Sequence, residues 1–233
     1  MRAVTLAMLA LLGSARPSGN VRAAVLALEA HFRGARTLKA AFFERYSDGK
    51  GGGAAESGTV YFSRPGRMRW EYESPEQKLF VVDATNVWFY VPADRTVSRA
   101  KLKESSDWRT PLALLTGKAD LSRLCRTIAL ADPAVPPSGG EGDAAMPSGN
   151  TLLRCVPRGM PNGSDDLVRE IYLETDADAR LVRVVIREAG NVETEFRFRN
   201  WEENIAVPEA RFHFQPPPGV AVVDEESLSG AIR

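Results

Sequence analysis

The chain has 233 residues and carries 30 Lys and Arg side chains against 30 Asp and Glu, which gives a formal net charge of zero at pH 7. Proteins that bind nucleic acid normally show a basic excess on one segment or face, so nucleic acid is not expected as a partner. The length fits one large all-β domain or two small domains, and we favour one.

The first residues predict export. An early Arg2, an apolar run over residues 3–12 and small residues at 13–15 form the three parts of a secretory signal peptide, with cleavage expected after Ala15. The apolar run is too short to cross a bilayer, and no later segment approaches the roughly 20 apolar residues of a transmembrane helix. We therefore expect residues 16–233 to form a single soluble, exported domain.

The next segment, residues 21–33, predicts an amphipathic helix. Its apolar residues recur at intervals of three and four, which places them on one helical face. They are Val21, Val25, Leu28 and Phe32. Gly34 stands where such a helix would end.

After this helix the pattern is that of strands. Eleven runs qualify, at about 37–46, 57–63, 67–72, 77–83, 86–91, 96–102, 124–130, 151–157, 168–174, 181–188 and 193–201. Short turn-forming links separate many neighbours, so consecutive strands are expected to pair as antiparallel hairpins. The pattern predicts a meander that bends into a barrel or half-barrel.

Two segments interrupt the strands. Residues 105–124 predict one or two short helices, because Thr110 and Pro111 resemble a cap followed by a proline at the first helical position. Residues 131–150 are rich in Pro, Gly, Ala and Ser and predict a flexible loop. If this loop closes a hairpin, Cys125 lies close to Cys155, so we favour a disulfide over two buried free thiols.

Aromatic residues alternate with charged ones in several strands, and alternation assigns them to one face. The inward positions of two runs, "RMRWEY" and "ETEFRFRNW", include Trp70, Tyr72, Phe196 and Phe198. The run "NVWFYV" is apolar on both faces, so Trp88 and Tyr90 could point one way and its other residues the opposite way. Such a set fits either an ordinary β-sandwich core or a ligand cavity, whose mouth better tolerates the polar groups of Trp and Tyr.

Few residues suggest catalysis. The two histidines, His31 and His213, lack partners with a catalytic spacing, and a structural role is favoured for both. No Cys or carboxylate cluster has metal-ligand spacing. The glycine-containing runs at 49–53 and 116–120 lack the pattern of a phosphate loop. We therefore expect a protein that is not an enzyme and that has no metal or other cofactor.

The order of features nevertheless resembles one family, the LolA-like periplasmic carriers of outer-membrane lipoproteins. The resemblance covers about residues 21–224 and rests on five segments in the family's order. They are "LKAAFFERY", "SGTVYFSRPGRMRWEY", "SPEQKLFVVDATNVWFYVP", "TPLALL" and "FHFQPPPGVAVVD". The resemblance implies a mainly β fold, an unclosed antiparallel β-barrel of about eleven strands whose open side is covered by an α-helical lid.

The resemblance also implies roles for individual residues. Arg64, which precedes the proline of the Arg-Pro motif, corresponds to the arginine that holds the lid shut, although an ordinary surface arginine at a strand end would look the same. The lid would present Val25, Leu28, Phe32, Leu112, Leu114 and Leu115. The lipid-binding cavity would be lined by Trp70, Tyr72, Leu79, Val81, Trp88, Tyr90, Phe196 and Phe198.

By the same resemblance, the chain is expected to be a monomeric periplasmic chaperone that carries acylated lipoproteins. Its other partners would be an inner-membrane ABC transporter that releases lipoproteins and an outer-membrane lipoprotein receptor. One alternative is a periplasmic module of the same fold that senses lipid or lipoprotein and regulates a membrane partner. Another is a periplasmic lipid hydrolase, for which the sequence offers no recognisable nucleophile and base.

Overall fold

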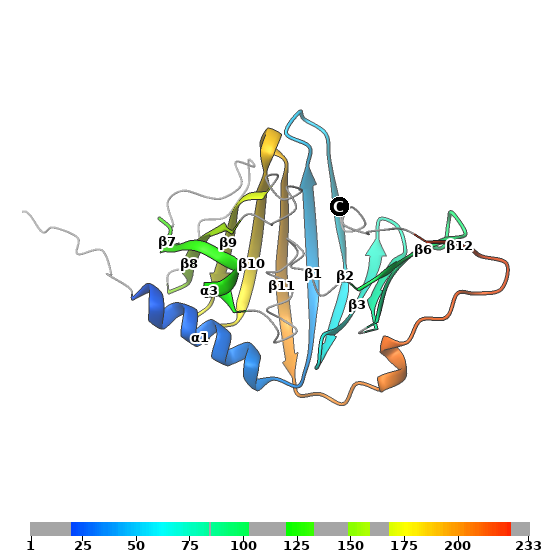
Figure 1. Ribbon diagram of the computed structural model, residues 1–233, viewed down its shortest axis with the longest axis horizontal. Coiled ribbons are helices and arrows are strands. Elements are labelled where there is room, and N and C mark those ends of the chain that lie inside the picture. The colour runs from blue at the N-terminus through cyan, green and yellow to red at the C-terminus, as the bar shows by residue number, and fades with distance from the viewer. Residues whose placement is uncertain (1–19, 84, 103–119, 133–148, 159–167, 225–233) are drawn as a thin grey trace, which may run out of the picture.

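The computed structural model describes residues 20–83, 85–102, 120–132, 149–158 and 168–224 (Figure 1). Its helices are α1 (Val21–Gly34) and α3 (Leu121–Leu124), with two 3₁₀ turns, η1 (Ala189–Asn191) and η2 (Glu209–Phe212). Its strands are β1 (Thr37–Ser47), β2 (Gly53–Ser63), β3 (Arg67–Ser74), β4 (Lys78–Val82), β5 (Asn86–Val91), β6 (Thr96–Lys101), β7 (Cys125–Leu130), β8 (Thr151–Pro157), β9 (Val168–Thr175), β10 (Leu181–Glu188), β11 (Glu193–Glu203) and β12 (Ala221–Asp224).

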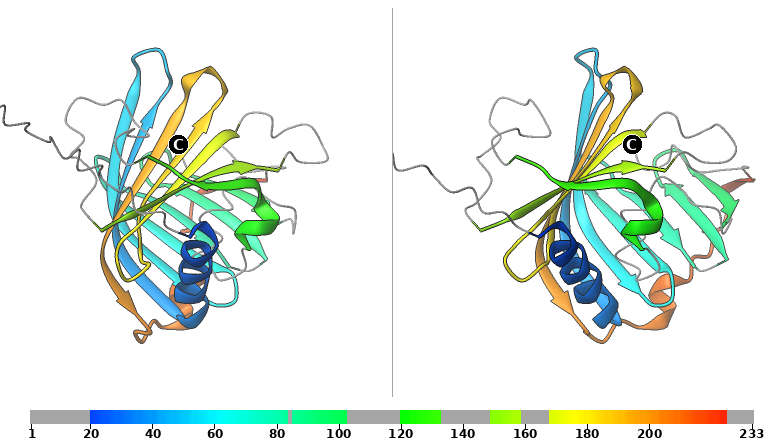
Figure 2. Two further views of the ribbon diagram at one scale, coloured as in Figure 1. Left: turned by 90° about the vertical axis from the view of Figure 1, so that its left-hand side faces the viewer. Right: turned by 60° about the vertical axis from the view of Figure 1, so that its left-hand side comes forward.

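All twelve strands form one curved sheet in the order β12-β6-β5-β4-β3-β2-β1-β11-β10-β9-β8-β7 (Figures 1 and 2). The fold prediction of an open, mainly antiparallel sheet is confirmed. Two runs of hairpins, β1 to β6 and β7 to β11, meet where β1 pairs with β11. The sequence missed β12, which adds to β6 as a parallel strand, because four residues with a distant partner leave no hairpin signal.

The alternation of side chains gives the sheet two faces with different roles. One face, here called the inner face, packs with α1 in the main apolar core, and Figure 2 shows α1 lying within the curve of the sheet. The opposite, outer face carries many Arg and Glu side chains and two small apolar clusters. Any function of α1 as a cover therefore concerns the inner face.

Helix α1 forms where its apolar spacing predicted it. The side chain of Asn20 caps it by accepting hydrogen bonds from the backbone N–H groups of Arg22 and Ala23 at 3.0 and 3.3 Å. Val25, Leu28 and Phe32 are buried against the inner face. In the described part of the chain, neither helix is long and apolar enough to cross a membrane.

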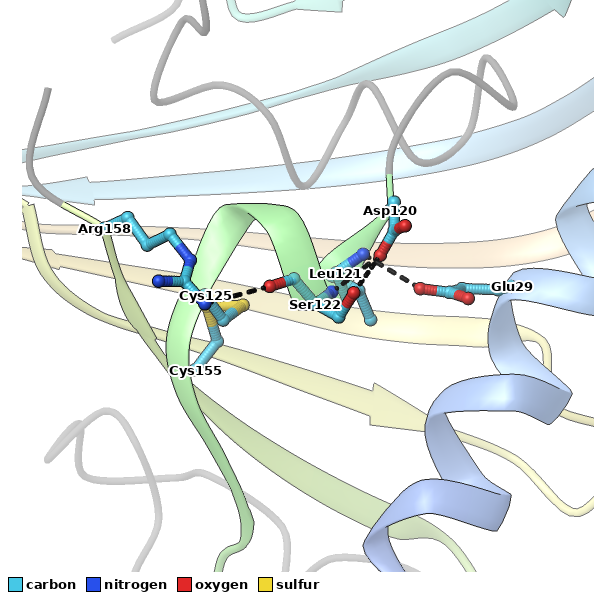
Figure 3. Close-up of a disulfide and its surroundings, with 7 residues drawn as sticks. All are labelled: Glu29, Asp120, Leu121, Ser122, Cys125, Cys155 and Arg158. Atoms are coloured by element: carbon cyan, nitrogen blue, oxygen red, sulfur yellow. Dashed lines mark hydrogen bonds between the residues drawn. A yellow bond between two sulfur atoms is a disulfide. The ribbon is translucent and has the colours of Figure 1, made fainter.

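The other described helix, α3, lies at the end of the segment for which short helices were expected (Figure 3). Asp120 caps it by accepting from the backbone N–H of Ser122 at 2.9 Å. Directly after α3, Cys125 forms a disulfide with Cys155 across the β7–β8 pair, with a Cα–Cα distance of 5.5 Å. The structure thus contains the pairing that the hairpin register favoured. Most of the expected 131–150 loop lies outside the described residues.

Candidate functional site

An aromatic cluster occupies the centre of the inner face. Phe42 of β1 contacts the rings of Trp70 and Tyr72 of β3 with centroid distances of 4.8 and 5.0 Å. Trp70 also meets Phe196 and Phe198 of β11, at 5.5 and 6.1 Å. Four of the residues expected in a cavity wall, Trp70, Tyr72, Phe196 and Phe198, are therefore brought together. The indole N–H of Trp70 is buried and has no hydrogen-bond partner among the described residues.

The other four expected wall residues lie on the outer face. They are Leu79, Val81, Trp88 and Tyr90. In the β3–β4 register Trp70 is opposite Phe80, so Phe80 shares the inner face and its neighbours point the other way. The eight residues therefore do not line a single cavity, and this part of the sequence-based assignment is wrong.

The outer-face group has its own cover from the C-terminal segment. The ring of Phe214 packs against Trp88 and Tyr90 with centroid distances of 5.6 and 5.7 Å. The indole N–H of Trp88 donates to the Asp83 carboxylate at 2.8 Å, and Arg99 lies over the same indole ring. Asp83 thus satisfies the indole N–H of Trp88, and the cluster packs as a small apolar core.

Sequence reasoning missed several residues of the inner face, namely Phe42, Val60, Phe62, Phe80 and Val82. A usable signal was present in "LKAAFFERY", where Leu38, Ala40 and Phe42 share one parity and are buried. The neighbouring Phe43 has the other parity and is 41% exposed. Because Phe42 and Phe43 are adjacent and both apolar, the alternation of buried and exposed residues becomes visible only when all residues of the strand are considered.

A polar pair borders the aromatic cluster on the same face. The hydroxyl of Tyr72 donates to Oε2 of Glu44 at 2.9 Å, while Oε1 of Glu44 is buried without a partner in the described part of the chain. Glu44 lies opposite Glu56 in the β1–β2 register, and Glu56 accepts a hydrogen bond from Lys78. Burial, more than the charge of Glu56, raises the pKa of Glu44 to about 7. Burial also raises the pKa of Tyr72.

Helix α1 covers the part of the inner face formed by β11 and its neighbours. Phe32 is fully buried and its ring meets that of Trp201, with centroids 5.8 Å apart. One turn earlier on the same buried side of the helix, the carboxylate of Glu29 accepts from the backbone N–H of Leu121 in α3 at 2.8 Å (Figure 3). The cover therefore combines apolar packing with polar contacts.

Arg64 makes one of those polar contacts. It lies in the β2–β3 turn, and its guanidinium donates to the backbone carbonyl oxygen of Arg33 in the last turn of α1. Helix C-terminal carbonyls lack intrahelical partners and favour a nearby cation. Burial, followed by the charge of Arg33, lowers the pKa of Arg64. Its Nε and second terminal nitrogen are buried and unpartnered among the described residues.

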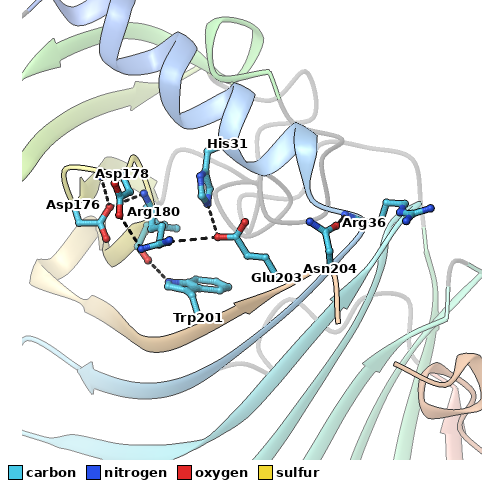
Figure 4. Close-up of polar contacts among 9 residues, drawn as sticks. His31, Arg36, Asp176, Asp178, Arg180, Trp201, Glu203 and Asn204 are labelled. Carbon is cyan, nitrogen blue, oxygen red and sulfur yellow. Dashed lines mark hydrogen bonds and ion pairs between the residues drawn. The ribbon is translucent and has the colours of Figure 1, made fainter. Parts of the chain in front are cut away.

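The C-terminal half of α1 has two further polar attachments to the end of β11 (Figure 4). Nε2 of His31 lies 3.1 Å from the Glu203 carboxylate, which also contacts Arg180 at 3.4 Å. The backbone N–H of Arg36, just after the helix, donates to the side-chain oxygen of Asn204 at 2.9 Å. Together with Arg64, these contacts fix the end of the helix that leads into β1.

The second expected lid segment cannot be placed. Leu112, Leu114 and Leu115 lie outside the described residues, so their inward orientation stays a prediction. No group of three or more His, Cys, Asp or Glu side chains that could hold a metal ion occurs in the described ranges. The inner face offers aromatic surface, the Glu44–Tyr72 pair and a helix packed over part of it, which is chemistry suited to holding an amphiphile.

Comparison with known proteins gives consistent matches. The family model described as outer membrane lipoprotein carrier protein LolA matches residues 33–132. The outer-membrane lipoprotein carrier protein of Dechloromonas aromatica is 30% identical over 203 residues, which cover 87% of this chain and 88% of that protein. The corresponding protein of Chromobacterium violaceum is 29% identical over 200 residues, covering 86% of this chain and 87% of its own.

A solved structure shares the fold. It is an uncharacterised conserved protein from Thermus thermophilus, with a TM-score of 0.51 at 15% sequence identity. The match covers 88% of this chain and 98% of the other. At this level of identity the likeness concerns the arrangement of the sheet and helix and not what either protein binds.

Proposed function

The chain belongs to the family of outer-membrane lipoprotein carrier proteins, and we propose that it is a periplasmic chaperone that holds lipoprotein acyl chains against its inner face. The observation that carries this proposal is the aromatic inner face, with Trp70 at its centre and α1 packed over part of it. The identification of lipoproteins as the cargo is supported by the two relatives, both of which are named outer-membrane lipoprotein carrier proteins. We propose no catalysis and no cofactor.

The physical need for such a protein follows from the cost of exposing acyl chains to water. Each exposed methylene costs about 0.8 kcal/mol, so a lipoprotein with several long chains cannot cross an aqueous compartment unaided. A carrier must therefore cover those chains and later release them. A buried aromatic face suits the first task, and a removable cover suits the second.

We propose that α1 is the movable part of this cover and that Arg64 is its latch. The hydrogen bond from Arg64 to the carbonyl oxygen of Arg33 joins the β2–β3 turn to the end of the helix. Desolvation of the guanidinium, which lowers the pKa of Arg64, opposes this favourable contact. An acyl chain that binds only the open state then shifts the population toward it.

We propose three kinds of partner: acylated lipoproteins as cargo, an inner-membrane ABC transporter that loads the carrier, and an outer-membrane receptor that unloads it. The carrier would act as a monomer. Polar contacts at α1 such as that of His31 with Glu203 are of a kind that a partner could displace. Nucleic acid is not proposed as a partner.

Native mass spectrometry of the protein purified from periplasmic extract tests this function. We expect triacylated lipoprotein to co-purify, and Arg64→Leu to change its amount or its release to outer membranes. Arg199→Leu, which alters an exposed arginine of β11, is the matched control and should behave like the unmodified protein.

Two results would contradict the proposal. If only phospholipid or nothing is bound, and isolated inner membranes release no lipoprotein to the protein, the carrier function fails and a lipid-sensing module of the same fold replaces it. Measurable turnover of lipid esters by the purified protein would instead favour a hydrolase.

A further inference from the structure

The Glu44–Tyr72 pair sets a carboxyl group into the apolar core of the inner face, where the ring of Tyr72 packs against Phe42. Glu44 is only 1% exposed. One of its carboxylate oxygens accepts from Tyr72, and the other has no partner in the described ranges. Buried polar groups in folded proteins are normally paired, so an unpaired one needs an explanation.

A second unpaired polar atom lies close by on the same face. Trp70 is fully buried and its indole N–H lacks a partner among the described residues. Trp70 and Tyr72 are two residues apart on β3, and both rings contact Phe42. Phe196, which also contacts Trp70, is directly opposite Glu44 in the β1–β11 register. A hydrogen-bond acceptor and a hydrogen-bond donor are thus set into one aromatic surface.

We propose that Glu44 and Trp70 form a polar subsite that recognises the amide linkage of an N-acylated cargo, while the hydrocarbon chain lies on the aromatic cluster. This inference rests on the proposed carrier function and specifies the amide linkage as the part of the ligand that the inner face recognises. The free oxygen of Glu44 accepts from the amide N–H, and the indole N–H of Trp70 donates to the amide carbonyl oxygen. An ester offers the carbonyl oxygen but no N–H.

The electrostatic surroundings of Glu44 make this recognition depend on pH. The titratable groups that face Glu44 among the described residues are Tyr72 on β3, Glu56 on β2, which is ion-paired, and its partner Lys78 on β4. Tyr46 follows two positions later on β1. Because burial raises the pKa of Glu44 to about 7, the carboxylate is the main form at pH 8 and the neutral acid is the main form at pH 6. The carboxylate accepts a hydrogen bond from the N–H of an amide ligand. The neutral acid can instead donate to the carbonyl oxygen of an amide or of an ester, so it does not distinguish them.

Two probes that differ only in the linkage test the subsite. The equilibrium dissociation constants of N-methyldodecanamide and methyl dodecanoate are measured by displacement of dansyl-undecanoic acid from the purified full chain. At pH 8 we expect the amide to bind about tenfold more tightly than the ester, as a hydrogen bond to a charged acceptor allows. At pH 6 the preference should fall below about twofold.

Three variants separate the contributions of the two residues. Glu44→Gln keeps the shape and the bond to Tyr72 but presents N–H groups in place of the free acceptor, so the amide preference at pH 8 should be lost. Trp70→Phe should weaken both probes alike and leave their ratio unchanged. Glu76→Gln, which changes an exposed carboxyl after β3, should retain the full preference.

The possible failures point to different conclusions. If both probes bind with equal affinity at pH 8, or if Glu44→Gln keeps the tenfold preference, the subsite is wrong and the carrier function stands. If neither probe displaces the fluorescent acid in any variant, the apolar inner face does not bind acyl chains, and the subsite fails together with the proposed function.

Discussion

Replacing Glu44 with glutamine should change how the stability of this protein depends on pH. In the folded state burial raises the pKa of Glu44 from its ordinary value of 4.5 to about 7. A carboxyl whose folded pKa lies above its unfolded value binds its proton more tightly in the folded state. Its stabilising contribution is therefore complete below about pH 4.5, decreases as the pH rises and is lost above about pH 7.

The size of the effect follows from the two pKa values. One pKa unit corresponds to about 1.4 kcal/mol, so the interval from 4.5 to about 7 corresponds to about 3 kcal/mol. The unmodified protein should lose this amount between pH 4.5 and pH 7 from Glu44 alone. Glutamine does not titrate, and Glu44→Gln should therefore be more stable than the parent above pH 7 by a few kcal/mol at most.

Urea denaturation of both proteins at half-unit intervals from pH 4.5 to pH 8 measures this difference. Other carboxyls also titrate in this range, so the informative quantity is the difference in unfolding free energy between parent and variant at each pH. That difference should grow toward high pH and level off near pH 7 to 8. Glu76→Gln provides the control for a surface carboxyl and should give a flat difference. A flat difference for Glu44→Gln as well would refute the assignment of a buried, desolvated carboxyl.

Three other predictions concern the cover and its neighbours. The disulfide of Cys125 and Cys155 spans a sequence separation of 30, so chain entropy predicts that reduction lowers the unfolding free energy by about 3.6 kcal/mol. Guanidinium denaturation with and without dithiothreitol measures this loss. A variant with both Cys125 and Cys155 replaced by Ser should show no effect of dithiothreitol. A loss below about 1 kcal/mol in the unmodified protein would contradict the prediction. Phe32→Ala, at a fully buried position, should cost about 3 to 5 kcal/mol in the same assay, and a cost near zero would mean that α1 is not packed. Arg64→Met should speed hydrogen exchange in residues 21–34 but not in β9 or β10, whereas unchanged exchange in α1 would remove Arg64 as a latch.

The strands were predictable because this fold is built mainly from hairpins. All eleven expected strands are present, and the first helix ends at Gly34, where the sequence predicted its end. Hairpin links and the period-two alternation are local signals. The addition of β12 to β6 is not local, since Ala221 pairs with Thr96 far away in the sequence.

The assignment of side chains to faces was less predictable. In "NVWFYV" the odd-numbered and the even-numbered residues are both apolar, so their alternation does not reveal which set faces α1. Trp88 lies on the outer face, where Phe214 packs over it. The importance of Glu44 was also hidden, because a glutamate in an alternating strand normally reads as a solvent-facing residue. Its shared parity with Phe42 was the only local sign that it points inward.

Photo-crosslinking with a triacylated peptide that carries a diazirine in one acyl chain tests the central claim most directly. After irradiation, residue-level mass spectrometry locates the adducts, and a peptide without acyl chains serves as the control. The account predicts adducts on the inner face, at or beside Phe42, Trp70 and Phe198, and on α1. Adducts confined to the outer-face cluster of Trp88 and Tyr90, or none above the control, would contradict it.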